Sequence, residues 1–188
     1  MEDQFEDQGI QFKIITEDMM VSVCDFMWEH FFPDEPISRS LNLTRHWLVD
    51  EAHLKDAMQD GCSMAAFDRE GKIIGVRLGK RKKRSQWALK MLERLPMILP
   101  SGLLRFLTGS TSLPIFLNLL VMAGYDVWKM FDELGCEQIY EDAALCSARN
   151  TGVRGLGTEL CRRTDELAKE LGCTHTYMQL PQVLQCVL

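Results

Sequence analysis

Residues 152–157 contain three glycines and lead directly into a segment with the pattern of an amphipathic helix. Residues 137–146 before them have the character of a β-strand, and the helical pattern continues to about Leu171, with leucines on one side and charged residues on the other. A strand, a glycine-rich turn and a helix N-terminus bring backbone N–H groups together at the positive end of a helix dipole. The sequence therefore predicts an anion site here, with phosphate as its natural ligand.

The spacing of these glycines excludes two common phosphate-binding loops. The P-loop requires GxxxxGK[ST], and no Gly-Lys pair in this chain is followed by Ser or Thr. The dinucleotide fingerprint requires GxGxxG after an early strand, whereas this chain has GxxGxG late in its sequence. A nucleotide triphosphatase and a dinucleotide-binding enzyme are therefore excluded. The glycines alone also fit a helix entry that simply needs flexible backbone.

Composition limits the number of domains and the classes of partner. The 188 residues, 46% of them hydrophobic, are enough for a single domain spanning residues 1–188. The formal net charge of -6 argues against nucleic acid or a membrane surface as partner, and polar residues interrupt the longest charge-free run, 106–125. Seven cysteines without metal-ligand spacing indicate reduced thiols and no metal. The acidic N-terminus is unlike a signal peptide, so we expect a cytoplasmic protein. We also expect it to be a monomer.

Periodicity and turn residues predict the order of the other elements. We expect a strand at 12–15, a helix capped by residues 16–18, a second helix at 44–58, a hairpin of strands 64–67 and 73–78, a mostly helical region at 85–134 and a last strand at 173–178. Hairpin and parallel elements are mixed, which predicts an α/β (α+β) fold with a mixed central sheet flanked by helices. The basic run at 80–84 is interpreted as a solvated loop, with an anion-contacting patch as the alternative.

Residues 31–37, FFPDEPI, follow the first predicted helix and resemble the FF-x-DEP-L segment of the insect arylalkylamine branch of the GCN5-related N-acetyltransferases. Residues 69–76, REGKIIGV, are similar to the middle strands of that family, and the glycine stretch resembles its acetyl-CoA loop, Gln/Arg-x-x-Gly-x-Gly/Ala. The resemblance covers about residues 12–178. It implies the acetyltransferase fold, acetyl-CoA as donor, no metal, and an arylalkylamine such as dopamine or serotonin, or a polyamine-like amine, as acceptor.

The resemblance also assigns roles to residues. Glu35, in the DEP triplet, is expected to be the general base that takes a proton from the amine. Trp28, Phe32 and Asp34 are expected to line the amine site. A strand N–H near residues 145–147 is expected to polarise the thioester carbonyl, and the glycine loop to hold the pyrophosphate, with Arg149 or Arg154 adding charge. The expected acetyl-CoA contacts are Leu145, Cys146, Ser147, Gly152, Val153, Arg154, Gly155, Leu156, Gly157 and Thr158.

Two alignments of the acetyl-CoA loop are open. If residues 155–157 supply the Gly-x-Gly, the motif begins at Gly152, where Gln or Arg is expected. If the motif begins at Arg154, its last position falls on Glu159, whose side chain would crowd the pyrophosphate. We therefore prefer the alignment that begins at Gly152.

The resemblance implies more chain after the strand at 174–178 than this sequence carries. Family members continue into a helix and two strands that supply a leaving-group acid and serines near the acceptor, and residues 179–188 have no matching positions. We expect a shortened acetyltransferase that lacks the usual C-terminal helix and strands, with an open sheet edge and an atypical tail at 179–188. Two functions stay open: an active amine N-acetyltransferase, and a catalytically silent protein that binds CoA or a partner.

Overall fold

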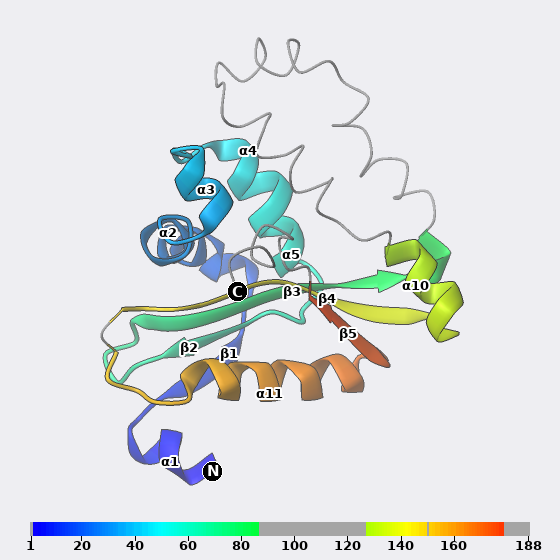
Figure 1. Ribbon diagram of the computed structural model, residues 1–188. Coiled ribbons are helices and arrows are strands. Elements are labelled where there is room, and N and C mark those ends of the chain that lie inside the picture. Colours follow the sequence, from blue (N-terminus) through cyan, green and yellow to red (C-terminus); the bar gives the residue numbers. More distant parts are fainter. Residues whose placement is uncertain (1, 87–126, 150, 179–188) are drawn as a thin grey trace, which may run out of the picture.

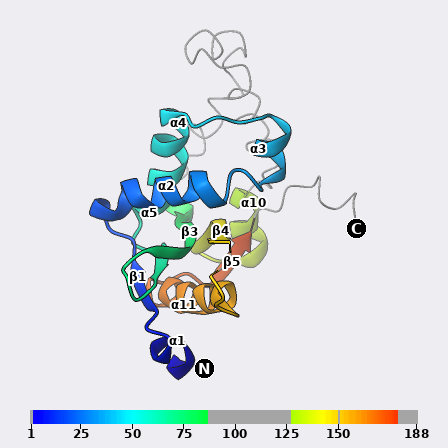
Figure 2. The same cartoon turned by 90° about the vertical axis from the view of Figure 1, so that its left-hand side faces the viewer.

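A computed structural model describes residues 2–86, 127–149 and 151–178. Figures 1 and 2 show one sheet between two layers of helices. The helices α2 (Met20–His30), α3 (Pro36–Ser40), α4 (Trp47–Val49) and α5 (Asp56–Met58) lie on one face, and α11 (Leu156–Glu170) lies on the other. This confirms the predicted fold class. The expected tail at 179–188 and the charge-free run at 106–125 lie outside the described residues.

The sheet has the strand order β1 (Gln11–Ile14), β2 (Met64–Phe67), β3 (Ile73–Lys83), β4 (Gln138–Ser147) and β5 (His175–Met178). Antiparallel pairing joins β1 through β4, and β5 pairs with β4 in parallel. All five strands were expected from local sequence, within one or two residues except at the C-terminal end of β3. The mixed sheet follows from a hairpin combined with a β4–α11–β5 crossover.

The strand β4 changes its neighbours halfway along its length. Its pairing with β5 extends from Ile139 opposite His175 to Asp142 opposite Met178. One residue later the register with β3 shifts, since Gly79 faces Asp142 and Leu78 faces Ala144, which leaves Ala143 as the extra residue of a β-bulge. Bulges bend and twist a strand. Among the described residues, the second half of β4, residues 143–147, therefore has β3 alone as its strand partner.

The helical segments differ in detail from the sequence prediction. A 3-10 helix, η1 (Glu17–Met19), precedes α2, and the Thr16 hydroxyl donates to Asp18 Oδ1 at 2.5 Å without capping the helix backbone. The helix expected at 44–58 begins at Trp47 and passes through a π-helical stretch, η2 (Asp50–Lys55). The other described helices are α1 (Glu2–Asp7), η3 (Arg84–Gln86) and α10 (Val127–Leu134).

The basic run at 80–84 is part of the sheet. The strand β3 continues to Lys83, and Arg84 begins η3. Lys80 and Lys82 lie with their Nζ atoms 3.8 and 3.5 Å from Glu141 Oε2, and Lys82 is only 7% exposed. The interpretation of this run as a solvated loop was wrong, because β4 supplies both the backbone partners and a carboxylate that the run itself does not reveal.

A buried arginine joins the sheet to α11. Arg77, 2% exposed, donates through Nε to Asp142 Oδ2 at 3.0 Å, and its Nη1 reaches Asp165 Oδ1 at 2.9 Å and the Cys161 carbonyl at 2.7 Å. Burial raises the pKa of Asp142, and the hydrogen bond from Arg77 offsets part of that rise. The side chain of Asp142 is therefore enclosed between the sheet and α11.

Removing the guanidinium of Arg77 should destabilise the folded protein, because the Asp142 carboxylate would stay buried without its cation. We expect Arg77→Met to lower the free energy of unfolding by about 3–5 kcal/mol, because Asp142 would be left buried and uncompensated. The double variant Arg77→Met/Asp142→Leu should recover most of that loss, as measured by urea unfolding.

The matched control for Arg77 is Arg84, which is 47% exposed and ion-paired with Asp132 at 2.6 Å. Arg84→Met should cost less than about 1 kcal/mol, as exposed pairs do. Equal losses in the two single variants would contradict a special role for the buried pair.

Candidate functional site

The turn before α11 has the geometry of an anion site. Gly152 and Gly155 adopt φ values of +67° and +78°, and Gly155 is the N-cap of α11. The first hydrogen bond within the helix joins Glu159 N–H to the Gly155 carbonyl at 2.9 Å. The N–H groups of residues 156–158 precede this bond and so have no acceptor within the helix. These three amides, at the positive end of the α11 dipole, can hold a phosphate.

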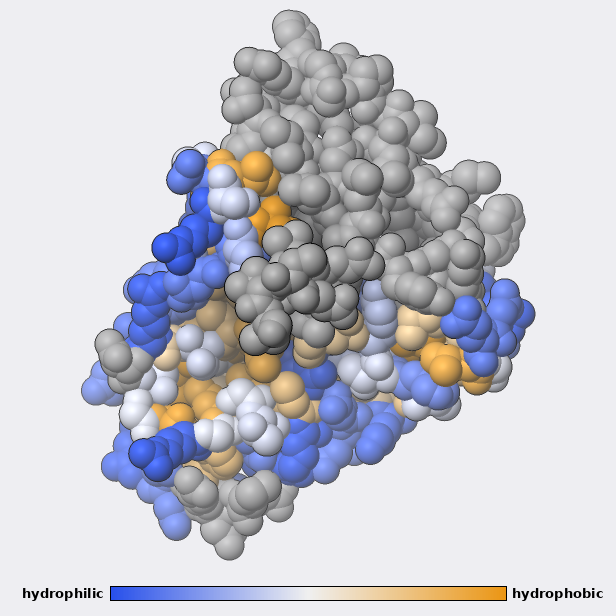
Figure 3. Space-filling view, in the orientation of Figure 1, coloured by the Kyte–Doolittle hydropathy of each residue, from blue (hydrophilic) through white to orange (hydrophobic). Residues whose placement is uncertain are grey.

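The same helical turn lies against the second half of β4. A Cβ atom added at Gly157 would be 3.7 Å from Leu145 Cδ2, and Leu145 is 37% exposed. Figure 3 shows hydrophobic side chains over the part of the sheet between the end of β4 and the start of α11, bordered by hydrophilic ones along the helix. In an antiparallel pair, alternate N–H groups point away from the partner strand. Strand and turn therefore form an extended, partly apolar surface that ends at the N–H groups of residues 156–158.

The side chain of Glu159 is held away from this turn. Glu159 is 2% exposed, and its carboxylate accepts hydrogen bonds from Arg162 Nη2 and Arg163 Nε, both at 2.7 Å. The two arginines lie one turn further along α11 and hold the carboxylate there. The Glu159 side chain therefore does not point into the loop, contrary to the expectation from sequence. That objection to the alignment beginning at Arg154 was wrong, and this alignment also places an arginine where the motif has Gln or Arg. The sequence did contain a signal for this arrangement, because arginines three and four residues after Glu159 on a helix can form ion pairs with it.

The FFPDEPI segment places Glu35 at the start of α3. Its Oε1 accepts from the Ile37 N–H at 3.0 Å and its Oε2 from the Ser38 N–H at 2.5 Å, so Glu35 is the N-cap of this helix. Pro36 at the first helical position favours this arrangement. The carboxylate is half-buried and fixed in orientation, and each oxygen keeps a further lone pair.

An ion pair joins this segment to the end of β4. Arg149 Nε donates to Asp34 Oδ2 at 3.2 Å, and Arg149 Nη2 donates to Asp34 Oδ1. The hydrogen bond from Arg149 holds the pKa of Asp34 below its ordinary value of 3.8. Residues 115 positions apart are thereby brought together, and two separately predicted parts of the site become neighbours.

The Cys146 side chain near this ion pair is a neutral thiol. Burial, and secondly the nearby Asp34 carboxylate, raise its pKa to about 11. A thiol with this pKa is not ionised at neutral pH, so it is a poor nucleophile. The site is therefore suited to direct attack by an acceptor and not to a cysteine intermediate.

The aromatic residues of the site pack on one another. Trp28 and Phe32 stack with ring centroids 4.1 Å apart, and Phe31 meets Phe32 edge-on at 5.4 Å. Phe32 is 4% exposed, and the Trp28 indole N–H donates to Asp50 Oδ1 at 2.6 Å. The aromatic residues expected to line the amine site lie together, and their exposed parts belong to Trp28 and Phe31, because Phe32 is covered by its neighbours.

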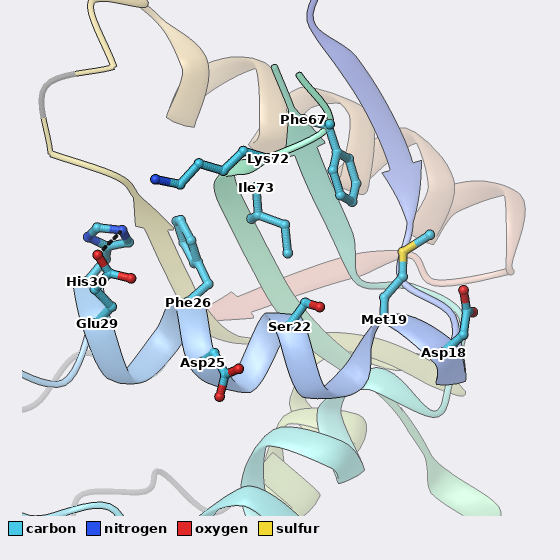
Figure 4. Close-up of a pocket in the computed structure, with 11 residues that line it drawn as sticks. Asp18, Met19, Ser22, Asp25, Phe26, Glu29, His30, Phe67, Lys72 and Ile73 are labelled. Atoms are coloured by element: carbon cyan, nitrogen blue, oxygen red, sulfur yellow. Dashed lines mark ion pairs between the residues drawn. The ribbon is translucent and has the colours of Figure 1, made fainter. Parts of the chain in front are cut away.

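A separate groove lies between α2 and the turn of the β2–β3 hairpin (Figure 4). Its volume is about 390 Å³, and Phe26 and Ile73 point into it while Lys72 extends toward His30. Its lining residues are Asp18, Met19, Ser22, Asp25, Phe26, Glu29, His30, Phe67, Gly71, Lys72 and Ile73. None of the residues expected to bind acetyl-CoA or the amine lines it, so this groove is distinct from the candidate site.

Within residues 2–86, 127–149 and 151–178, no group of three His, Cys, Asp or Glu side chains is placed to hold a metal ion. In the same ranges, no helix is long and apolar enough to cross a membrane.

No family model matches the chain, and no curated protein matches it in sequence. Among solved structures, it is similar to arylalkylamine N-acetyltransferase 2 from Aedes aegypti, with a TM-score of 0.69 and 25% identity over 87% of this chain and 72% of that one. It is also similar to mosquito arylalkylamine N-acetyltransferase like 5b, with a TM-score of 0.67 and 19% identity over 87% and 73% of the two chains. A Drosophila melanogaster polyamine N acetyltransferase matches with a TM-score of 0.65 and 17% identity over 95% and 79%.

The hydrogen bonds from Arg162 and Arg163 to the Glu159 carboxylate, called here the Glu159 clamp, predict a pH dependence of stability. Hydrogen bonds from Arg162, and then Arg163, hold the pKa of Glu159 below its ordinary value of 4.5. A carboxylate with a lowered folded-state pKa contributes stability above its unfolded pKa and loses it as the pH falls through the folded value. We therefore expect Glu159→Gln to destabilise the protein most near neutral pH, with the difference from wild type shrinking below the ordinary pKa. Urea unfolding across this pH range measures it.

Glu166 is the control, since it pairs with Arg162 at 2.7 Å but is 54% exposed. Glu166→Gln should change stability little at any pH. If the two variants showed the same pH dependence, the buried clamp would not be its source.

Proposed function

We propose that this chain, a member of the GCN5-related N-acetyltransferase superfamily that resembles the insect arylalkylamine N-acetyltransferases, transfers an acetyl group from acetyl-CoA to a primary amine. The proposed acceptors are arylalkylamines such as dopamine and serotonin, and polyamine-like amines. One observation carries the proposal: the Asp34–Arg149 ion pair places the segment with Glu35 beside the end of β4, and the first turn of α11 lies against Leu145 on the same strand.

The proposed acetyl-CoA site follows the second half of β4 into the α11 turn. The N–H groups of residues 156–158 would bind the pyrophosphate, and exposed Arg154 would add positive charge. The pantetheine arm would lie along residues 143–147, which β5 does not cover within the described residues. Outward N–H groups of that strand would polarise the thioester carbonyl.

The proposed reaction is direct acyl transfer with Glu35 as general base. An alkylamine is mostly protonated at neutral pH, so a proton must leave its nitrogen before attack, and Glu35 would accept that proton directly or through water. The nitrogen then forms a bond to the acetyl carbon, the bond from that carbon to sulfur breaks, and the CoA sulfur takes up a proton. The neutral Cys146 thiol supports direct attack. The two backbone hydrogen bonds to Glu35 would keep its carboxylate in one orientation.

A second function is favoured by the same hydrogen bonds. Because both oxygens of Glu35 already accept backbone N–H groups, the carboxylate has a complete structural role as a helix cap. The second candidate is therefore a catalytically silent protein that binds CoA through the α11 turn.

Glu35→Gln distinguishes the two functions. We expect the variant to lose about 10²–10⁴-fold in turnover, the usual contribution of a general base, while its Kd for CoA stays unchanged. Thiol release from acetyl-CoA with dopamine, serotonin, tyramine and agmatine measures turnover, and a CoA titration measures binding. Glu166→Gln, which changes an exposed glutamate of α11 outside the proposed site, is the control and should retain turnover.

The outcomes separate cleanly. If wild type binds CoA without turnover for any amine, the silent function holds and the enzyme proposal fails. If wild type neither binds CoA nor releases thiol, both proposals are wrong. Because Glu35 also caps α3, thermal unfolding of Glu35→Gln must match wild type within about 1 kcal/mol for its turnover to be interpreted.

A further inference from the structure

We infer that residues 2–9 form an N-terminal brace that positions the anion-binding turn of α11, with Phe5 and Arg69 as positioning residues. The brace comprises α1 and the turn after it, and Figures 1 and 2 both place α1 beside the N-terminal end of α11. The inference rests on the proposed function in one respect, namely that the ligand of this turn is the pyrophosphate of acetyl-CoA.

Phe5 packs in the core that lies against the turn. It is 4% exposed and belongs to the same buried cluster as Leu156 and Leu160, the residues by which the start of α11 packs on the sheet. Val153, in the glycine loop, packs against this cluster as well. The loop and the first helical turn therefore share one apolar support, and Phe5 is its contribution from the brace.

A second set of contacts connects Phe5 to the Glu159 clamp. The ring of Phe5 meets Phe12 edge-on, with centroids 5.6 Å apart and planes at 85°. The guanidinium of Arg163 lies 4.4 Å from the centre of the Phe12 ring, and Arg163 Nε donates to Glu159. Edge-on rings and a cation over a ring are both favourable geometries. The brace thus also supports the arginine that helps to hold the Glu159 carboxylate away from the turn.

Arg69 fastens the brace to the β2–β3 hairpin. Its Nε donates to the Gln8 carbonyl at 2.9 Å and its Nη2 to the Asp7 carbonyl at 2.8 Å, at the C-terminal end of α1. Gly9 has φ +70°, and a Cβ atom there would overlap the Arg69 side chain. A six-residue helix is too short to be stable alone, so α1 depends on these bonds and on Phe5.

The brace should affect ligand binding more than the chemical step. Phe5 and Arg69 support the turn that would bind the pyrophosphate, whereas Glu35 and the Asp34–Arg149 pair lie in the α2–α3 segment and at the end of β4. Loosening the brace should therefore raise the KM for acetyl-CoA with little change in kcat, which is the signature of lost uniform binding.

The test compares Phe5→Ala with Phe131→Ala. Phe131 is also a buried phenylalanine, 0% exposed, but it belongs to a separate cluster with Cys136 and Ile139 near the start of β4. Both variants should lose stability through the cavity they create. Only Phe5→Ala should raise the Kd for CoA, by about tenfold. Acetyl-pantetheine, which lacks the pyrophosphate, should react equally well with Phe5→Ala and wild type.

Two further variants keep the test decisive if Phe5→Ala folds poorly. Phe5→Leu retains most of the apolar volume and should restore CoA affinity. Arg69→Met removes the two carbonyl bonds without creating a core cavity and should weaken CoA binding in the same direction as Phe5→Ala.

Hydrogen exchange of the ligand-free protein provides a readout that is independent of CoA. The hydrogen-bonded amides from Glu159 onward in the first two turns of α11 should exchange faster in Phe5→Ala and Arg69→Met than in wild type, and not in Phe131→Ala. If wild type fails to bind CoA, the proposed function fails while this exchange result still decides the brace. Unchanged exchange in Phe5→Ala and Arg69→Met, or equal changes in Phe131→Ala, would overturn the brace.

Discussion

The pairing of β4 is the constraint on which the rest of the site depends. β3 accompanies this strand along its whole length, but within the described residues β5 accompanies it only as far as Asp142. The bulge at Ala143 lies at that point, and the buried pair of Arg77 with Asp142 ties the same position to α11. Within the described residues, β5 therefore does not use the backbone N–H groups on the outer edge of residues 143–147.

A second constraint is the negative charge of Glu159 in the first turn of α11. An acidic side chain in the first turn of a helix would compete with a phosphate for the same positive field. Glu159 is instead neutralised by Arg162 and Arg163, and Arg163 is itself placed over Phe12. The carboxylate of Glu159 is therefore paired with cations at a distance from the turn, and α11 itself provides no acceptor for the N–H groups of residues 156–158.

Sequence reasoning succeeded where the signal is local and failed where a distant partner decides. The β2–β3 hairpin and the β4–turn–α11 unit follow from alternation, turn residues and helical periodicity within short windows. The basic run at 80–84 was misassigned because its strand partner and its carboxylate, Glu141, lie some sixty positions later. The objection to Glu159 was wrong because a residue's type does not reveal the direction of its side chain.

The sequence by itself determined the order of the strands, the glycine-rich entry to α11, and the resemblance from which Glu35 and the turn are expected to be site residues. These depend on periodicity, on backbone freedom at glycine and on short motifs. Only the tertiary structure decided that Asp34 meets Arg149, that Phe32 is covered while Trp28 and Phe31 are partly exposed, and that the N-terminal brace lies under the turn. Those arrangements arise from packing and charge pairing between residues far apart in the chain, which no local pattern encodes.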